Sequence, residues 1–160
     1  MEEWEKIISV ANIFSDSTKL LEVFQTALSK QNNSDAVNIS KQTIIPTVVL
    51  KAFACEMYLK SYLSKGGTTS IPKTHNLYEL YRNLNKSTKN KMNSLLLIEL
   101  KRTLPYYKKD DLENDLKGIS NAFEEWRYFY EGNNIINLQF LNSFYDILRN
   151  AAIRPRVNTI

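Results

Sequence analysis

Three ionisable side chains, Glu56, His75 and Arg127, are the residues of this chain best placed for chemistry. Arg127 lies within the aromatic run 123–131, Phe-Glu-Glu-Trp-Arg-Tyr-Phe-Tyr-Glu. On a helix it falls about 40° from Phe123 and therefore within an inward stripe. An unpaired charge in a core is very costly, so this guanidinium needs an acceptor. Because guanidinium also binds phosphate through two parallel hydrogen bonds, Arg127 predicts either a structural ion pair or an oxyanion contact.

Glu56 is the candidate acceptor, because it stands at the centre of an otherwise apolar stripe with helical spacing. The stripe comprises Ile45, Val49, Ala52, Glu56, Leu59 and Leu63. A carboxylate at such a position is either buried and paired or marks a water-accessible cleft. We therefore predict a Glu56–Arg127 pair in the core.

His75 is the single histidine of the chain and precedes a short predicted helix. One interpretation is a helix cap or a loop contact. The other is that His75 folds back over Glu56 and Arg127, where imidazole would serve as an acid and a base near neutral pH.

Tyr130 and Glu131 also have two interpretations. Either Tyr130 packs in the core and Glu131 is a helix-end charge, or the two line a pocket beside Arg127.

The elements that must position these residues are helices. Apolar residues recur at steps of three and four, while Gly and Pro number only 4 each. Helical patterns cover roughly 3–30, where a break at 15–18 stays open, then 46–64, 77–84, 88–104, 110–131 and 135–151. Residues 31–42 are polar and are expected to form a loop. We predict an all-α fold in a single domain spanning 1–160, an antiparallel bundle of four main helices plus a short helix.

Composition excludes several classes of site. With one Cys and one His the chain lacks the ligands for a Cys/His zinc site, so neither a metal nor a cofactor is expected. No apolar run approaches the ~18 residues of a membrane span, and the acidic N-terminus is unlike a signal peptide. We expect a cytoplasmic protein with no membrane partner.

The net charge is mildly positive, with 21 basic and 17 acidic residues. This balance is compatible with a nucleic-acid partner. Two basic clusters suit either phosphate contacts or an ordinary solvated surface. They are Lys65, Lys73, Lys86, Lys89 and Lys91, and then Lys101, Arg102, Lys108 and Lys109.

Two segments taken together resemble a known family. The first is Ala-Cys-Glu-Met-Tyr-Leu-Lys at 54–60, followed by Thr-His-Asn-Leu-Tyr-Glu-Leu at 74–80, and the second is the aromatic run 123–131. This order resembles HEPN-domain proteins (higher eukaryotes and prokaryotes nucleotide-binding). In that family an A-x-E-x-x-L-K helix is followed by a T-H-x-L-x-x-L turn, and a later helix carries the functional Arg. The resemblance covers about 45–148 and matches Arg127 to that Arg.

The resemblance implies an all-α homodimer. Many family members are metal-independent ribonucleases of toxin–antitoxin, abortive-infection and CRISPR systems, and four to six intervening residues separate their Arg from a following His. Here Gly132, Asn133 and Asn134 occupy those positions, so the chain is similar to members that lack the Arg-x4-6-His signature.

Three functions therefore stay open. The first is a degenerate, non-catalytic module associated with RNA or a nucleotide in prokaryotic defence or a toxin–antitoxin system. The second is an active metal-independent ribonuclease that uses Arg127 with His75 or Tyr130. The third is a scaffold that binds only protein, such as a cognate antitoxin.

Overall fold

A computed structural model describes residues 1–31, 33–68, 70–127 and 137–153, with Arg127 and Ile153 described by their backbone alone. The predicted all-α bundle is confirmed, since the described residues form helices and no strand. The helices are α1 (Glu3–Ser29), α2 (Ser34–Gln42), α3 (Ile44–Lys65), α4 (Leu77–Arg82), α5 (Lys86–Thr103), α6 (Lys109–Gly118), α7 (Ala122–Arg127) and α8 (Leu138–Ile153). None of these helices combines the length and the apolar character that a membrane span requires.

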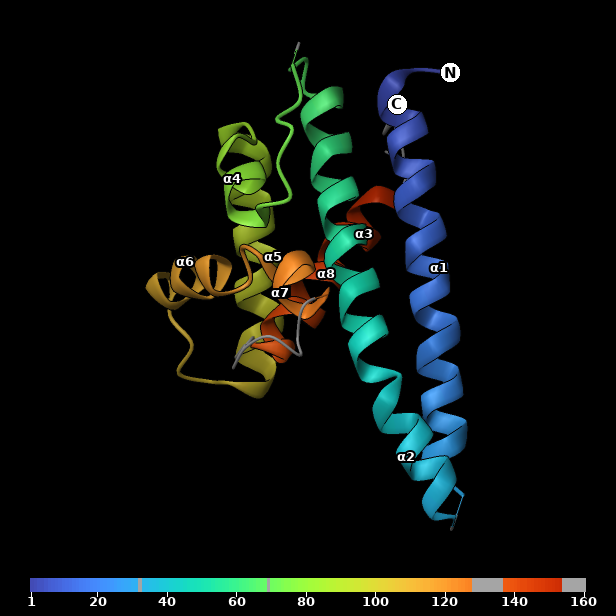
Figure 1. Cartoon of the computed structure of the whole chain (residues 1–160). Coiled ribbons are helices and arrows are strands. Elements are labelled where there is room, and N and C mark those ends of the chain that lie inside the picture. Colours follow the sequence, from blue (N-terminus) through green and yellow to red (C-terminus); the bar gives the residue numbers. More distant parts are fainter. Residues whose placement is uncertain (32, 69, 128–136, 154–160) are drawn as a thin grey trace, which may run out of the picture.

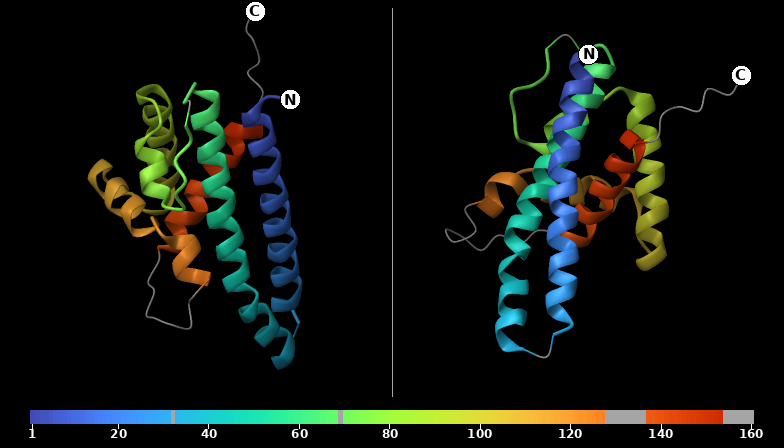
Figure 2. Two further views of the ribbon diagram at one scale, coloured as in Figure 1. Left: turned by 45° about the horizontal axis from the view of Figure 1, so that its top comes forward. Right: turned by 90° about the vertical axis from the view of Figure 1, so that its right-hand side faces the viewer.

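Helix α3 is the centre of the bundle. It runs antiparallel to α1 along most of its length and also packs against α7 and α8 (Figures 1 and 2). Its sequence explains this position, because Ala52, Cys55 and Leu59 share one face of the helix, Ala54 and Tyr58 lie on other sides of it, and all five are fully buried. A helix that is apolar on several sides must be surrounded by other elements. Cys55, the single cysteine, is therefore a reduced thiol inside the core.

Helix α1 is continuous through its polar stretch at 15–18, which closes the question left open by the sequence. The hydroxyls of Ser17 and Thr18 donate to the carbonyls of Ile13 and Phe14, each at 2.9 Å and four residues back. These bonds satisfy the hydroxyls without breaking the helix. Ser15 is fully buried and bonds to α8, so Ser15 and Thr18 belong to the packed interior, while Asp16 is exposed.

The loop predicted for residues 31–42 is wrong, because this segment forms α2. Asn33 caps the helix, with its Oδ1 accepting from the backbone N of Asp35 at 2.9 Å. Ala36 is buried, and α2 packs mainly on the last part of α1. One buried alanine on a polar helix gives little periodic signal in the sequence, so tertiary packing decides the structure here.

The single helix predicted for 110–131 is also wrong. Helix α6 ends at Gly118, and α7 starts at Ala122 in a different direction (Figure 1). The carbonyl of Ser120 accepts from the backbone N of Leu77 at 2.8 Å, and Asn121 Oδ1 accepts from Asn76 Nδ2 at 2.9 Å. These two bonds tie the turn between α6 and α7 to the start of α4.

Candidate functional site

The candidate site is built around Glu56, which is only 1% exposed. Its Oε1 accepts from Lys60 Nζ at 2.7 Å, and its Oε2 lies 2.9 Å from His75 Nδ1. Lys60 follows Glu56 by one turn of α3, a spacing that brings the two side chains together. Both oxygens of this buried carboxylate therefore have a partner, as burial of a charge requires.

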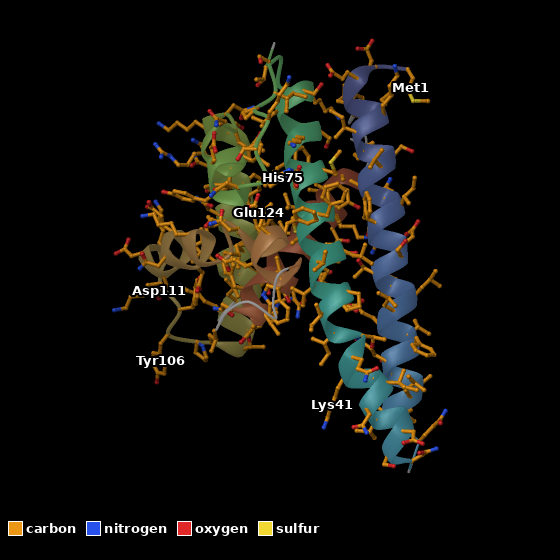
Figure 3. All side chains as sticks on the ribbon, viewed as in Figure 1. Met1, Lys41, His75, Tyr106, Asp111 and Glu124 are labelled. Atoms are coloured by element: carbon orange, nitrogen blue, oxygen red, sulfur yellow. The ribbon has the colours of Figure 1, made fainter. Side chains whose placement is uncertain are left out.

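His75 reaches Glu56 because the segment before α4 returns along α3 (Figure 3). Asn76 and Leu77, directly after His75, are held by the turn between α6 and α7. Thr74 Oγ1 accepts from the backbone N of Asn76 at 3.1 Å, which closes a tight turn around the histidine. Bonds on both sides of His75 thus fix its backbone opposite Glu56. The structure thus places segment 74–80 beside segment 54–60.

An aromatic row connects this pair to α7. The rings of His75 and Phe123 have centroids 5.3 Å apart, and Phe123 stacks on Phe53 of α3 at 5.1 Å. Phe53 in turn meets Phe14 of α1 edge-on at 4.4 Å. Because Phe123 precedes Arg127 by one helical turn, the helix that bears Arg127 lies directly against the Glu56–His75 pair.

The tautomer of His75 follows from its partner. An ionised carboxylate can only accept hydrogen bonds, so Nδ1 carries the proton that bonds to Glu56. The second ring nitrogen, Nε2, is then the basic nitrogen of the neutral ring or an N–H donor of the protonated ring. The side chain of His75 is 49% exposed, so solvent and a ligand have access to the imidazole. We call this arrangement the Glu56–His75 dyad.

The remaining predicted site residues are Arg127, Tyr130 and Glu131. The side chain of Arg127 and all of Tyr130 and Glu131 lie outside the described residues. The predicted Glu56–Arg127 pair thus stays a prediction, while the described partners of Glu56 are Lys60 and His75. Within the described ranges, no group of three or more His, Cys, Asp and Glu side chains is arranged for a metal ion.

A buried polar network that sequence reasoning missed lies on a different face of α3 from Glu56. Tyr58 donates to Asn12 Oδ1 at 2.9 Å, and the hydroxyls of Ser15 and Tyr145 are 2.6 Å apart. Burial raises the pKa of Tyr145 to about 12, although its bond to Ser15 opposes the shift. The network joins α1 to α3 and α8. Its sequence signal was weak, because its members Asn12, Ser15, Tyr58 and Tyr145 come from three separate helices.

Comparisons with protein-family models, with curated proteins and with solved structures gave no match to this chain. The functional interpretation accordingly depends on side-chain geometry.

Proposed function

We propose that the protein is a HEPN-like module that binds RNA or a nucleotide, with the Glu56–His75 dyad as the centre that meets a phosphate. The observation that carries the proposal is a half-exposed imidazole held by a buried carboxylate beside α7. By the resemblance, the setting is prokaryotic defence or a toxin–antitoxin system, and the acting form is a cytoplasmic homodimer.

The charges around Glu56 support an anionic ligand. One carboxylate faces two cationic groups, Lys60 and the protonated form of His75, so the centre is net positive once the imidazole is charged. Lys73, two residues before His75, is exposed and adds a further positive charge to the same segment. A charged imidazole N–H and nearby ammonium groups make short, strong hydrogen bonds to phosphate oxygens.

Fluorescence anisotropy with a labelled single-stranded RNA at moderate salt tests the proposal. His75→Ala should weaken binding about tenfold, since one charge-assisted hydrogen bond is lost. Lys41→Ala, an exposed lysine at the end of α2, is the matched control and should leave affinity unchanged. If wild-type protein binds no RNA or mononucleotide at any salt concentration, the protein-only scaffold is the better interpretation.

The tautomer at His75 favours a second candidate, metal-independent cleavage of RNA. With Nδ1 bonded to Glu56, neutral Nε2 can take the proton of a ribose 2′-hydroxyl as its oxygen attacks the adjacent phosphorus. The P–O5′ bond then breaks, leaving a 2′,3′-cyclic phosphate and a 5′-hydroxyl end once a proton is delivered to the leaving oxygen. Arg127 is the proposed group for the phosphate oxygens.

RNA cleavage in excess EDTA tests this second candidate, because EDTA excludes metal nucleases. His75→Ala should lower the rate about a hundredfold or more, in line with loss of a general base. Glu56→Gln should lower it less, since Gln keeps an acceptor for Nδ1 but removes the charge. Cleavage by His75→Ala at the wild-type rate would exclude the histidine from the mechanism and leave the binding function alone.

A further inference from the structure

An open groove runs along the second half of α1, the helix at one edge of the bundle (Figures 1 and 2). Its volume is about 530 Å³, and its lining residues are Lys19, Glu22, Val23, Thr26, Ala27 and Lys30. Because a single helix supplies the whole lining, the groove is open along its length. Small-molecule sites enclose most of their ligand, so this groove fits an elongated partner better.

Large apolar side chains of α1 lie in and beside the groove. Leu20 is 73% exposed, Val23 68% and Phe24 46%, and Ala27 is exposed as well. Their positions follow the pattern i, i+3, i+4 and i+7, which places them on one face of the helix. Ile13, at 61% exposure, continues this face towards the N-terminus. Contiguous exposed apolar surface is typical of sites that bind another protein.

The core of the fold does not use this outer face of α1. The inner side of the helix packs on α3 and α8 through the fully buried Ala11, Ser15 and Thr18. Helix α1 therefore has an apolar face in solvent in addition to the side that it buries. A helix with apolar residues on both sides is expected to be covered on both.

Two lysines give one flank of the groove a positive charge. Lys19 and Lys30 are about 20° apart around the helix and about 16 Å apart along its axis. Neither forms an ion pair with a described residue. Glu22, the carboxylate of the lining, is paired with Lys51 Nζ at 2.5 Å, and the same ammonium donates to Asn142 Oδ1 at 2.7 Å. The groove thus has two positive charges without a partner.

We propose that this groove binds an amphipathic helix of another protein, with Asp or Glu along one flank. The apolar residues of that helix pack on Leu20, Val23 and Phe24, since residues at helical spacing on one helix fit the same spacing on a second. Its carboxylates pair with Lys19 and Lys30. A mainly aliphatic surface does not suit RNA, whose bases stack on aromatic rings. This function goes beyond the RNA contact proposed at His75 and does not depend on it.

Selection of random displayed peptides against the full chain tests the proposal, with peptides long enough for about four helical turns. Enriched peptides should have Leu, Ile or Phe at steps of three and four, with Asp or Glu beside them. Enrichment of peptides without acidic residues, or no enrichment at all, would overturn the proposal.

Fluorescence anisotropy with one labelled peptide from the selection locates its site. Leu20→Ser and Lys30→Glu should each weaken binding about tenfold or more, because each removes a contact at the centre or flank of the groove. Ile98→Ser and Lys91→Glu are the matched controls, since both residues are exposed on α5, and they should bind like wild type. An equal loss in the controls would show non-specific binding and contradict the proposal.

Two further measurements identify a different occupant if there is one. Loss of RNA binding in Leu20→Ser would assign the groove to RNA, and conversion of a dimer to a monomer by Leu20→Ser, measured by light scattering, would assign it to a second copy of this chain. Either result would overturn the proposal. His75→Ala should leave peptide affinity unchanged, so failure of the RNA-binding function and failure of the peptide site are distinguishable.

Discussion

At the scale of single residues, the proposed function depends on how the buried carboxylate of Glu56 orients His75. Glu56 leaves His75 with one defined hydrogen-bonding arrangement and holds its ring against Phe123. Lys60 balances the charge that burial of Glu56 would otherwise leave uncompensated.

The first prediction concerns the tautomer of His75. In wild-type protein the neutral ring should carry its proton on Nδ1, because Glu56 accepts there. Glu56→Ala removes the acceptor and should abolish this preference. Long-range ¹H–¹⁵N correlation spectra of the ring nitrogens measure both states. A wild-type spectrum with Nδ1 unprotonated would contradict the geometry.

The second prediction concerns Tyr145, whose hydroxyl is bonded to Ser15 inside the core. Tyr145→Phe should lower the free energy of unfolding by about 1–2 kcal/mol at neutral pH, since Ser15 loses a buried partner. Burial raises the pKa of Tyr145 to about 12 in the folded state, whereas an unfolded tyrosine titrates near 10.

The higher pKa of Tyr145 in the folded state determines how its contribution to the free energy of unfolding changes with pH. The folded protein holds the phenol proton more tightly, so the contribution of Tyr145 is complete below about pH 10 and is lost as pH rises towards 12. Urea unfolding at pH 8 and pH 11 should show a larger loss of stability for wild type than for Tyr145→Phe. An equal loss in both proteins would show that Tyr145 does not titrate differently on folding.

At the scale of elements, the sequence predicted helices well where apolar spacing is strong and failed where tertiary contacts decide. The spans of α1, α3 and α4 follow from the spacing of their apolar residues. Asn76 caps α4, since its Oδ1 accepts from the backbone N of Glu79 at 2.8 Å. Helix α2 was missed because Ala36 is its one buried residue. The break between α6 and α7 was missed because its cause, the contact of Ser120 with Leu77, joins distant parts of the chain.

The same limits apply to the site. Sequence reasoning named Glu56 and His75, and it gave the return of His75 towards Glu56 as one of two alternatives. It could not choose between them, since the choice depends on Asn121 and Ser120 holding the turn beside α4.

The third prediction tests the cause of the break after α6. A Cβ added at Gly118 meets nothing within 4 Å, and the backbone there does not require glycine. Gly118→Ala should therefore be neutral or stabilise by up to about 1 kcal/mol through helix propensity, and the break should persist. Chemical denaturation measures the first effect and backbone chemical shifts of 119–121 the second. A continuous helix in the variant would show that the glycine, rather than the Ser120 contact, ends α6.

At the scale of the whole molecule, α3 separates two regions with different roles. One face of α3 meets α1 and α8 through the network of Tyr58 and Tyr145, while Glu56 meets the segment before α4 and lies near α7. The first region holds the bundle together, and the second presents ionisable groups to solvent.

The fourth prediction follows from this separation. Tyr145→Phe and His75→Ala share no bonding partner, so their effects on the free energy of unfolding should add within about 0.5 kcal/mol. A double-mutant cycle by urea denaturation measures the coupling. A coupling well above that value would show that the two faces of α3 respond as one unit.

The single cysteine gives the core a chemical reporter of its own. Cys55 is fully buried at the centre of α3, and burial raises the pKa of its thiol. A thiol reagent must therefore wait for α3 to open before it reacts. Pulsed alkylation followed by intact-mass spectrometry will measure how often the central helix opens in the unmodified protein. No engineered label is needed. If RNA or a mononucleotide slows the alkylation of Cys55, the decrease in rate will report that the ligand binds and stabilises the folded protein.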